Sequence, residues 1–210
     1  MADVLGMLEP GYSRRIEVRV PSRVISVGVR TALERLGYEL VDASPRGAAP
    51  DARIVATGRL SRLRAEAREP VILIGGSQSR DVDDPRVVGV VRPPAGILAL
   101  YSLLQSALEA HPRAAPRVPA SLPARSLRDG IDAPGAILSL SEGGCRLRST
   151  AASLAGAGAL QLQFALPNSG VIYTGADPRY QVGKESGLAF TGLPEASRAA
   201  IADFVMASLS

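Results

Sequence analysis

Two periodicities of apolar residues alternate over the first 110 residues of this 210-residue chain. Segments such as 15–20 alternate apolar and charged positions, as in a strand with one buried face. Segments such as 97–110 place leucines at helical spacing. The expected strands are 15–20, 38–41, 52–57, 70–74 and 87–91, and the expected helices are 21–36, 60–67 and 97–110.

The clearest strand signal is Pro-Val-Ile-Leu-Ile at 70–74, which is apolar throughout. A continuous apolar run is typical of a strand buried on both faces of a parallel sheet. Strands that alternate with helices also predict parallel pairing through right-handed crossovers. Residues 1–110 are therefore expected to form an α/β domain.

The pattern changes in the second half of the chain, where segments such as Leu-Gln-Leu-Gln-Phe at 160–164 alternate strictly. Several short strands separated by turn residues and followed by one amphipathic helix predict a small antiparallel β-barrel with a closing helix. The expected strands are 124–128, 136–140, 145–148, 160–164, 171–173 and 187–190, and the expected helix is 195–209.

Four prolines between these two patterns, at positions 112, 116, 119 and 123, predict an extended and locally stiff linker. The expected organisation is an α/β domain at 1–110, a Pro/Arg linker at 111–123 and a β-barrel domain at 124–210. The fold class is thus α/β followed by all-β.

Charge and composition exclude several classes of function. The 24 Lys and Arg against 20 Asp and Glu give a net charge of +4, but the arginines are interleaved with acids and form no basic arm, so DNA binding is not expected. One cysteine, Cys145, and one histidine, His111, exclude a disulfide framework, a zinc cluster and a Ser/His/Asp triad. No catalytic constellation is visible, and we do not expect an enzyme.

Three further features have simple explanations. Asp81, Asp83 and Asp84 share a loop without the partner acids of a cation site, so no metal is expected. The segment Gly-Gly-Ser at 75–77 lacks the spacing of a phosphate-binding loop and is expected to be a tight turn. The first residues do not resemble a signal peptide, and no apolar run reaches the roughly 20 residues of a membrane span, so a cytoplasmic location is expected.

Two short motifs lie at the start of the second half. Arg113 and Arg117 are four residues apart in the proline-containing linker, and Ser139, Ser141 and Gly144 form a Ser-x-Ser-x-x-Gly pattern at the end of an apolar run. A guanidinium can hydrogen-bond a phosphate or a guanine edge through two N–H groups and can stack on a base. Taken singly, the motifs also fit a charged linker and an ordinary hairpin turn.

The order and separation of these motifs, with the strand pattern that follows, resemble the PilZ family, whose motifs are RxxxR and [DN]xSxxG. The resemblance implies a barrel that binds cyclic di-GMP, with Arg113, Arg117, Ser139, Ser141 and Gly144 as the ligand-binding residues. Position 139 departs from the family pattern, because Ser139 stands where the family has Asp or Asn. A serine hydroxyl can meet a guanine edge in part, with less reach.

The first domain resembles the receiver domain of response regulators in the order of its elements and in Arg92-Pro93, where receivers have Lys-Pro. Phosphoryl transfer in receivers needs an acidic nucleophile after the third strand and acids that hold a divalent cation. Here the third strand ends Ala56-Thr57-Gly58 and the first is followed by Pro21-Ser22. The resemblance therefore implies a pseudo-receiver without a phosphoacceptor.

These resemblances suggest two functions. In the first, the chain is a cyclic di-GMP-responsive effector in which ligand binding orders the linker and reorients the pseudo-receiver domain toward a protein partner. The alternative is a ligand-independent adaptor, a degenerate PilZ protein, in bacterial motility or polarity signalling. The Arg pair favours the first function and Ser139 favours the second.

Overall fold

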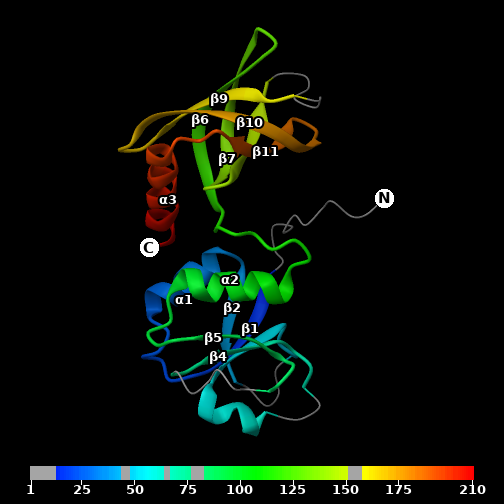
Figure 1. Ribbon diagram of the computed structural model, residues 1–210, viewed down its shortest axis with the longest axis vertical. Coiled ribbons are helices and arrows are strands. Elements are labelled where there is room, and N and C mark those ends of the chain that lie inside the picture. Colours follow the sequence, from blue (N-terminus) through cyan, green and yellow to red (C-terminus); the bar gives the residue numbers. More distant parts are fainter. Residues whose placement is uncertain (1–12, 44–47, 64–66, 77–82, 151–157) are drawn as a thin grey trace. The chain divides into compact units, whose positions relative to one another are not determined.

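The computed structural model describes residues 13–43, 48–63, 67–76, 83–150 and 158–210 (Figure 1). The chain divides into two compact units, Met1–Ala114 and Ala115–Ser210. The first unit contains a parallel sheet with helices, and the second is a closed antiparallel barrel followed by one helix. The predicted fold class is therefore confirmed.

Five parallel strands form the sheet of the first unit, in the order β2-β1-β3-β4-β5. This is the strand order of flavodoxin-like sheets, which receiver domains share. The strands are β1 (Arg14–Arg19), β2 (Tyr38–Asp42), β3 (Ala52–Ala56), β4 (Val71–Ile74) and β5 (Val87–Val91).

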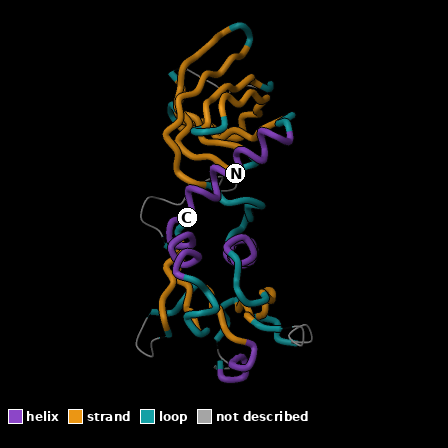
Figure 2. The backbone as a smooth tube through the Cα atoms, turned by 90° about the vertical axis from the view of Figure 1, so that its left-hand side faces the viewer, coloured by secondary structure: helices purple, strands orange, loops and turns teal. Residues whose placement is uncertain are grey.

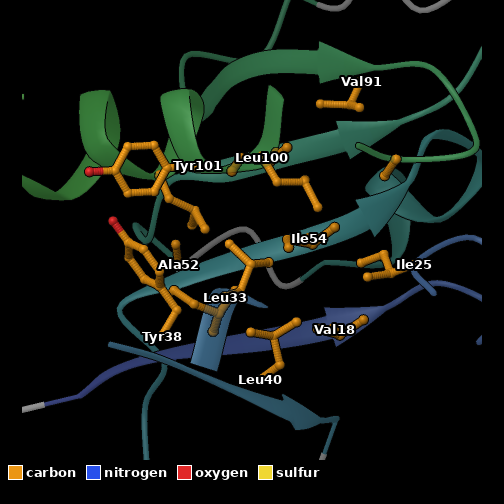
Figure 3. Packing of buried hydrophobic residues seen from close by; sticks show 14 of the residues in the cluster. Val18, Ile25, Leu33, Tyr38, Leu40, Ala52, Ile54, Val91, Leu100 and Tyr101 are labelled. Carbon is orange, nitrogen blue, oxygen red and sulfur yellow. The ribbon is translucent and has the colours of Figure 1, made fainter. Parts of the chain in front are cut away.

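Helices α1 (Val27–Arg35) and α2 (Ile97–Leu108) pack together on one apolar cluster with the sheet, as Figure 3 shows. Leu33 from α1 and Leu100 from α2 have no exposed surface there. A smaller cluster around Val55 and Leu73 includes the 3₁₀ helix η1 (Thr57–Arg62). Side chains of one strand point alternately to opposite faces, so the sheet is buried on both sides.

The helices of this unit differ from the prediction. Helix α1 was expected from residue 21 but begins at Val27, because the Ser26 hydroxyl accepts a hydrogen bond from the Val29 N–H at 3.2 Å and caps the helix. The helix expected at 60–67 is η1 over its described part. In the described part of the unit, α1 and α2 are the only α-helices, so the receiver resemblance stays a prediction.

Six strands form the barrel of the second unit, closed in the order β10-β11-β8-β7-β6-β9. Figure 2 shows these strands wrapping around a common interior. Strand β6 begins within the expected linker, at Val118. The strands are β6 (Val118–Arg128), β7 (Ile131–Ser141), β8 (Gly144–Ser149), β9 (Leu160–Leu166), β10 (Gly170–Val182) and β11 (Glu185–Thr191).

Helix α3 (Glu195–Leu209) follows the last strand and packs against β6, β7 and β9. Its buried residues Ile201, Val205 and Leu209 recur every four positions, which places them on one face. The predicted closing helix is confirmed. None of the helices in the described ranges is long and apolar enough to cross a membrane.

The acidic loop that follows β4 contains an ion pair. Asp84 accepts hydrogen bonds from the Arg86 guanidinium at 2.7 Å and 3.0 Å, and these bonds lower the pKa of the Asp84 carboxyl to about 2. Asp81 lies outside the described residues. Within the ranges that the structure describes, no group of three or more His, Cys, Asp or Glu could hold a metal ion.

Candidate functional site on the outer face of the barrel

The Ser-x-Ser-x-x-Gly motif lies on the hairpin of β7 and β8. Ser139 pairs with Arg146, and Ser141 pairs with Gly144. A β-bulge between Ile137 and Ser139 inserts one extra residue into β7. Ile137 and Leu140 therefore both point into the barrel core, at 0% exposure, while the intervening Ser139 stays half-buried.

Ser139 belongs to a row of residues that lie directly opposite one another across five strands. Opposed residues of an antiparallel pair point to the same face of the sheet. Because Ser139 points away from the core, the whole row points outward, and we call it the Ser139 row. Its members, from β6 to β10, are Pro119, Ser139, Arg146, Gly187 and Tyr180.

Tyr180 covers Gly187 at the far end of this row. A Cβ atom at Gly187 would lie 2.1 Å from Cε1 of the Tyr180 ring, so only glycine leaves room for the ring this close to the backbone. In the register Tyr180 and Arg146 lie on either side of Gly187. The row thus combines a hydroxyl, a guanidinium and an aromatic ring on one surface.

Glu185 of β11 connects two arginines beside the row. Its Oε1 accepts a hydrogen bond from Nη2 of Arg148 at 2.7 Å, and its Oε2 lies 3.6 Å from Nε of Arg146. The side chains of Arg146, Arg148 and Glu185 are 36%, 59% and 24% exposed. The acid therefore forms an ion pair with a cation that sits directly opposite Ser139.

Gly144 is required by the barrel itself. A Cβ atom at this position would lie 2.1 Å from the carbonyl oxygen of Leu188 on the neighbouring strand. The Ser141 hydroxyl donates to the carbonyl oxygen of Gly144 at 3.0 Å and is buried. Both residues were predicted to meet a ligand, and the contacts that the structure gives them hold strands together.

The two arginines of the RxxxR motif belong to different units. Arg117 lies in the second unit, half-buried, just before β6, and its charge acts on Cys145. Burial raises the pKa of the Cys145 thiol to about 12, and Arg117 opposes part of that rise. Cys145 is fully buried, as predicted for a small apolar residue.

Arg113 lies in the first unit and its side chain is exposed. Its backbone N–H donates to Oε1 of Gln105 at 2.9 Å. The Gln105 amide is buried on α2 and its Nε2 donates to the Tyr38 hydroxyl at 2.8 Å. Two hydrogen bonds through the Gln105 side chain therefore connect the backbone of Arg113 to Tyr38 in the core of the first unit.

Arg146, Tyr180 and Glu185 lie outside the motifs that the sequence shows. Arg146 could have been suspected, since it lies two positions after Gly144 and alternation along a strand returns it to the same face. The contribution of Tyr180 and Glu185 depends on the pairing of β10, β11 and β8, which no local pattern gives.

Residues 111–207 match the family model of the PilZ domain, so this part of the chain is a PilZ domain, as predicted. No curated protein matches the sequence. Several solved structures resemble part of the chain at low identity. The inhibitor of motility MotI/DgrA of Bacillus subtilis is 17% identical, with 46% of this chain and 50% of that chain covered and a TM-score of 0.42.

The PilZ domain of YcgR from Escherichia coli, solved with c-di-GMP, is 15% identical, with 47% of this chain and 92% of that chain covered and a TM-score of 0.39. The PlzA protein of Borreliella burgdorferi, in complex with c-di-GMP, is 20% identical, with 54% and 49% covered and a TM-score of 0.37. The match spans about half the length of MotI/DgrA and of PlzA.

Proposed function

We propose that this protein is a cytoplasmic effector that binds cyclic di-GMP through its PilZ domain and passes the binding event to a protein partner. The observation that carries the proposal is the pair Arg113 and Arg117 at the entry to a PilZ domain whose outer face presents Ser139 and Arg146. No catalytic step is part of this function.

The chemistry of the outer face suits a ligand with two phosphates and two guanines. Arg117 and Arg146 offer guanidinium groups, which bind phosphate or the O6 and N7 atoms of guanine through two hydrogen bonds. The Tyr180 ring, exposed in part over Gly187, offers a surface on which a base can stack. Stacking of a base on an aromatic ring contributes about 1 to 3 kcal/mol.

Transmission to the first unit would start at Arg113. Its backbone is hydrogen-bonded to Gln105 of α2 while its side chain is exposed. A ligand that draws the Arg113 side chain to the barrel favours linker conformations in which this hydrogen bond breaks. The pseudo-receiver unit, in which β3 ends without an acid at Ala56, Thr57 or Gly58, would then serve as the surface for the protein partner.

Isothermal titration with cyclic di-GMP tests the proposal. Arg117→Ala should lower the affinity by about 2 to 4 kcal/mol, since it removes charge-assisted hydrogen bonds to a dianion. Arg198→Ala is the matched control, because Arg198 is an exposed arginine on α3 of the same unit and should leave the affinity unchanged. Equal effects of the two substitutions would show that Arg117 supplies only general charge.

Ser139 favours the second candidate function, a ligand-independent adaptor, since the family residue that meets a guanine edge is absent there. Ser139→Asp restores this residue and distinguishes the two functions. If neither the unchanged protein nor Ser139→Asp binds at about 100 μM cyclic di-GMP, where binding energy is below roughly 5.5 kcal/mol, the protein is an adaptor.

A further inference from the structure

A carboxylate lies beside the Ser139 row although position 139 itself lacks one. Glu185 is joined to Arg146, the residue directly opposite Ser139, through Oε2 at 3.6 Å from Nε. Asp177 is another acid of the barrel and pairs with Ala189. Asp177 lies on β10, which is one strand farther from β7 than the strand of Glu185. Glu185 is therefore the acid that the register brings closer to the position where the family pattern has one.

The contacts of Glu185 leave it able to accept more hydrogen bonds. Its Oε1 accepts from Nη2 and Nε of Arg148, at 2.7 Å and 3.3 Å, while Oε2 faces Arg146 at the longer distance of 3.6 Å. Two carboxylate oxygens together accept about four hydrogen bonds. Two arginines of the neighbouring strand contact the group, and its 24% exposure leaves the remaining acceptor positions open to a ligand.

Guanine offers the donors that such a carboxylate can accept. The N1–H and the 2-amino group lie side by side on one edge of the base, and two carboxylate oxygens match them as a bidentate pair. Arg146 and Tyr180 flank Gly187, which lies two positions along β11 from Glu185. A base stacked at Tyr180 would thus have a guanidinium and a carboxylate near its edges.

We propose that Glu185, oriented by Arg146 and Arg148, reads the guanine edge in this protein in place of the acidic or amide residue that position 139 lacks. The inference rests on the proposed function, since it names the group that makes the site specific for guanine. Ser139 then has a minor part in recognition. The specificity for guanine comes from Glu185, which the pairing of β8 and β11 places beside Arg146.

The test compares cyclic di-GMP with cyclic di-IMP, whose hypoxanthine bases lack the 2-amino group, by isothermal titration of the full chain. The unchanged protein should prefer cyclic di-GMP by about tenfold or more, the discrimination expected of one bidentate base contact. Glu185→Gln should lose about tenfold in affinity for cyclic di-GMP, because the glutamine N–H₂ opposes a guanine donor. Its affinity for cyclic di-IMP should fall less, because hypoxanthine keeps the N1–H, which the glutamine carbonyl can still accept, and has no 2-amino group to oppose the glutamine N–H₂.

Asp132→Asn is the matched control. Asp132 accepts hydrogen bonds from Arg125 across the β6–β7 hairpin, so it is also a carboxylate paired with an arginine of the neighbouring strand. The Asp132→Asn substitution should change the affinity for neither cyclic di-GMP nor cyclic di-IMP. If Glu185→Gln weakens both ligands equally, Glu185 acts only by positioning arginines, and the inference is wrong.

If Glu185→Gln leaves both affinities unchanged, as Asp132→Asn should, while Arg117→Ala abolishes binding, the inference is again wrong but the proposed function stands. Absence of binding by the unchanged protein overturns both. Unchanged melting temperatures of Glu185→Gln and Asp132→Asn, within about 2 °C, show that differences in affinity do not come from unfolding.

Discussion

Gly144, the last residue of the Ser-x-Ser-x-x-Gly motif, is required by the packing of strand β8 against β11. We predict that Gly144→Ala destabilises the barrel by about 1 to 3 kcal/mol, because the added Cβ would lie 2.1 Å from the Leu188 carbonyl oxygen and strands β8 and β11 must move apart. Gly143→Ala is the control, since open space surrounds that position. Urea unfolding of both variants measures the difference, and equal midpoints would contradict the prediction.

Cys145 makes the free energy of unfolding of the barrel depend on pH in the alkaline range. Burial raises the pKa of its thiol to about 12, so the folded state holds the proton more tightly than the unfolded state. The corresponding stabilisation is complete below about pH 8.5 and is lost as the pH rises toward 12. We predict that urea midpoints fall less steeply between pH 9 and 11 in Cys145→Val than in the unchanged protein.

The same burial makes the thiol a probe of folding. At pH 8 the native protein should not react with a thiol reagent, and the reaction should follow unfolding in urea. Rapid labelling of Cys145 without denaturant would show that the barrel opens locally near β8, and it would also remove the basis for the predicted pH dependence.

At the scale of elements, helix α2 holds the linker through one side chain. We predict that Gln105→Ala abolishes the protection of the Arg113 amide against hydrogen exchange, because the acceptor of its N–H is gone. It should also destabilise the first unit by about 1 to 3 kcal/mol, since the buried Tyr38 hydroxyl loses its donor. Ser106→Ala, an exposed change on the same helix, should do neither.

Most elements of this protein could be predicted from apolar periodicity, and the exceptions have local causes. The start of α1 was misplaced because Val24 and Val27 fit a helical stripe, although Ser26 caps the helix and Val27 is 80% exposed. Strand β10 runs through Pro178, where a proline argues against a strand, because a bulge between Pro178 and Tyr180 accommodates it.

From the sequence, the candidate site could be predicted only for residues of one hairpin. Ser139, Ser141 and Gly144 lie on one hairpin, and their grouping follows from the sequence. The approach of Glu185 to Arg146 depends on barrel closure, which pairs segments about 40 residues apart. Register between distant strands is set by the whole barrel, so a single sequence does not reveal it.

At the scale of the whole molecule, the boundary between the units at Ala114 and Ala115 separates the two arginines of one motif. Arg113 is tied by its backbone to Gln105, and Arg117 precedes the first barrel strand. A ligand that engages both side chains must therefore act on both units, whereas a ligand that engages Arg117 alone acts on the barrel. This division makes Arg113 the residue whose response shows whether ligand binding reaches the first unit.

We predict that cyclic di-GMP at saturating concentration speeds hydrogen exchange at the Arg113 amide, because drawing its side chain to the barrel breaks the 2.9 Å hydrogen bond to Gln105. Exchange in strand β4, which is buried throughout, should not change and serves as the internal control. Arg117→Ala should prevent the effect by lowering the affinity. If the unchanged protein binds the ligand and the Arg113 amide exchanges as before, the barrel senses cyclic di-GMP without moving the linker.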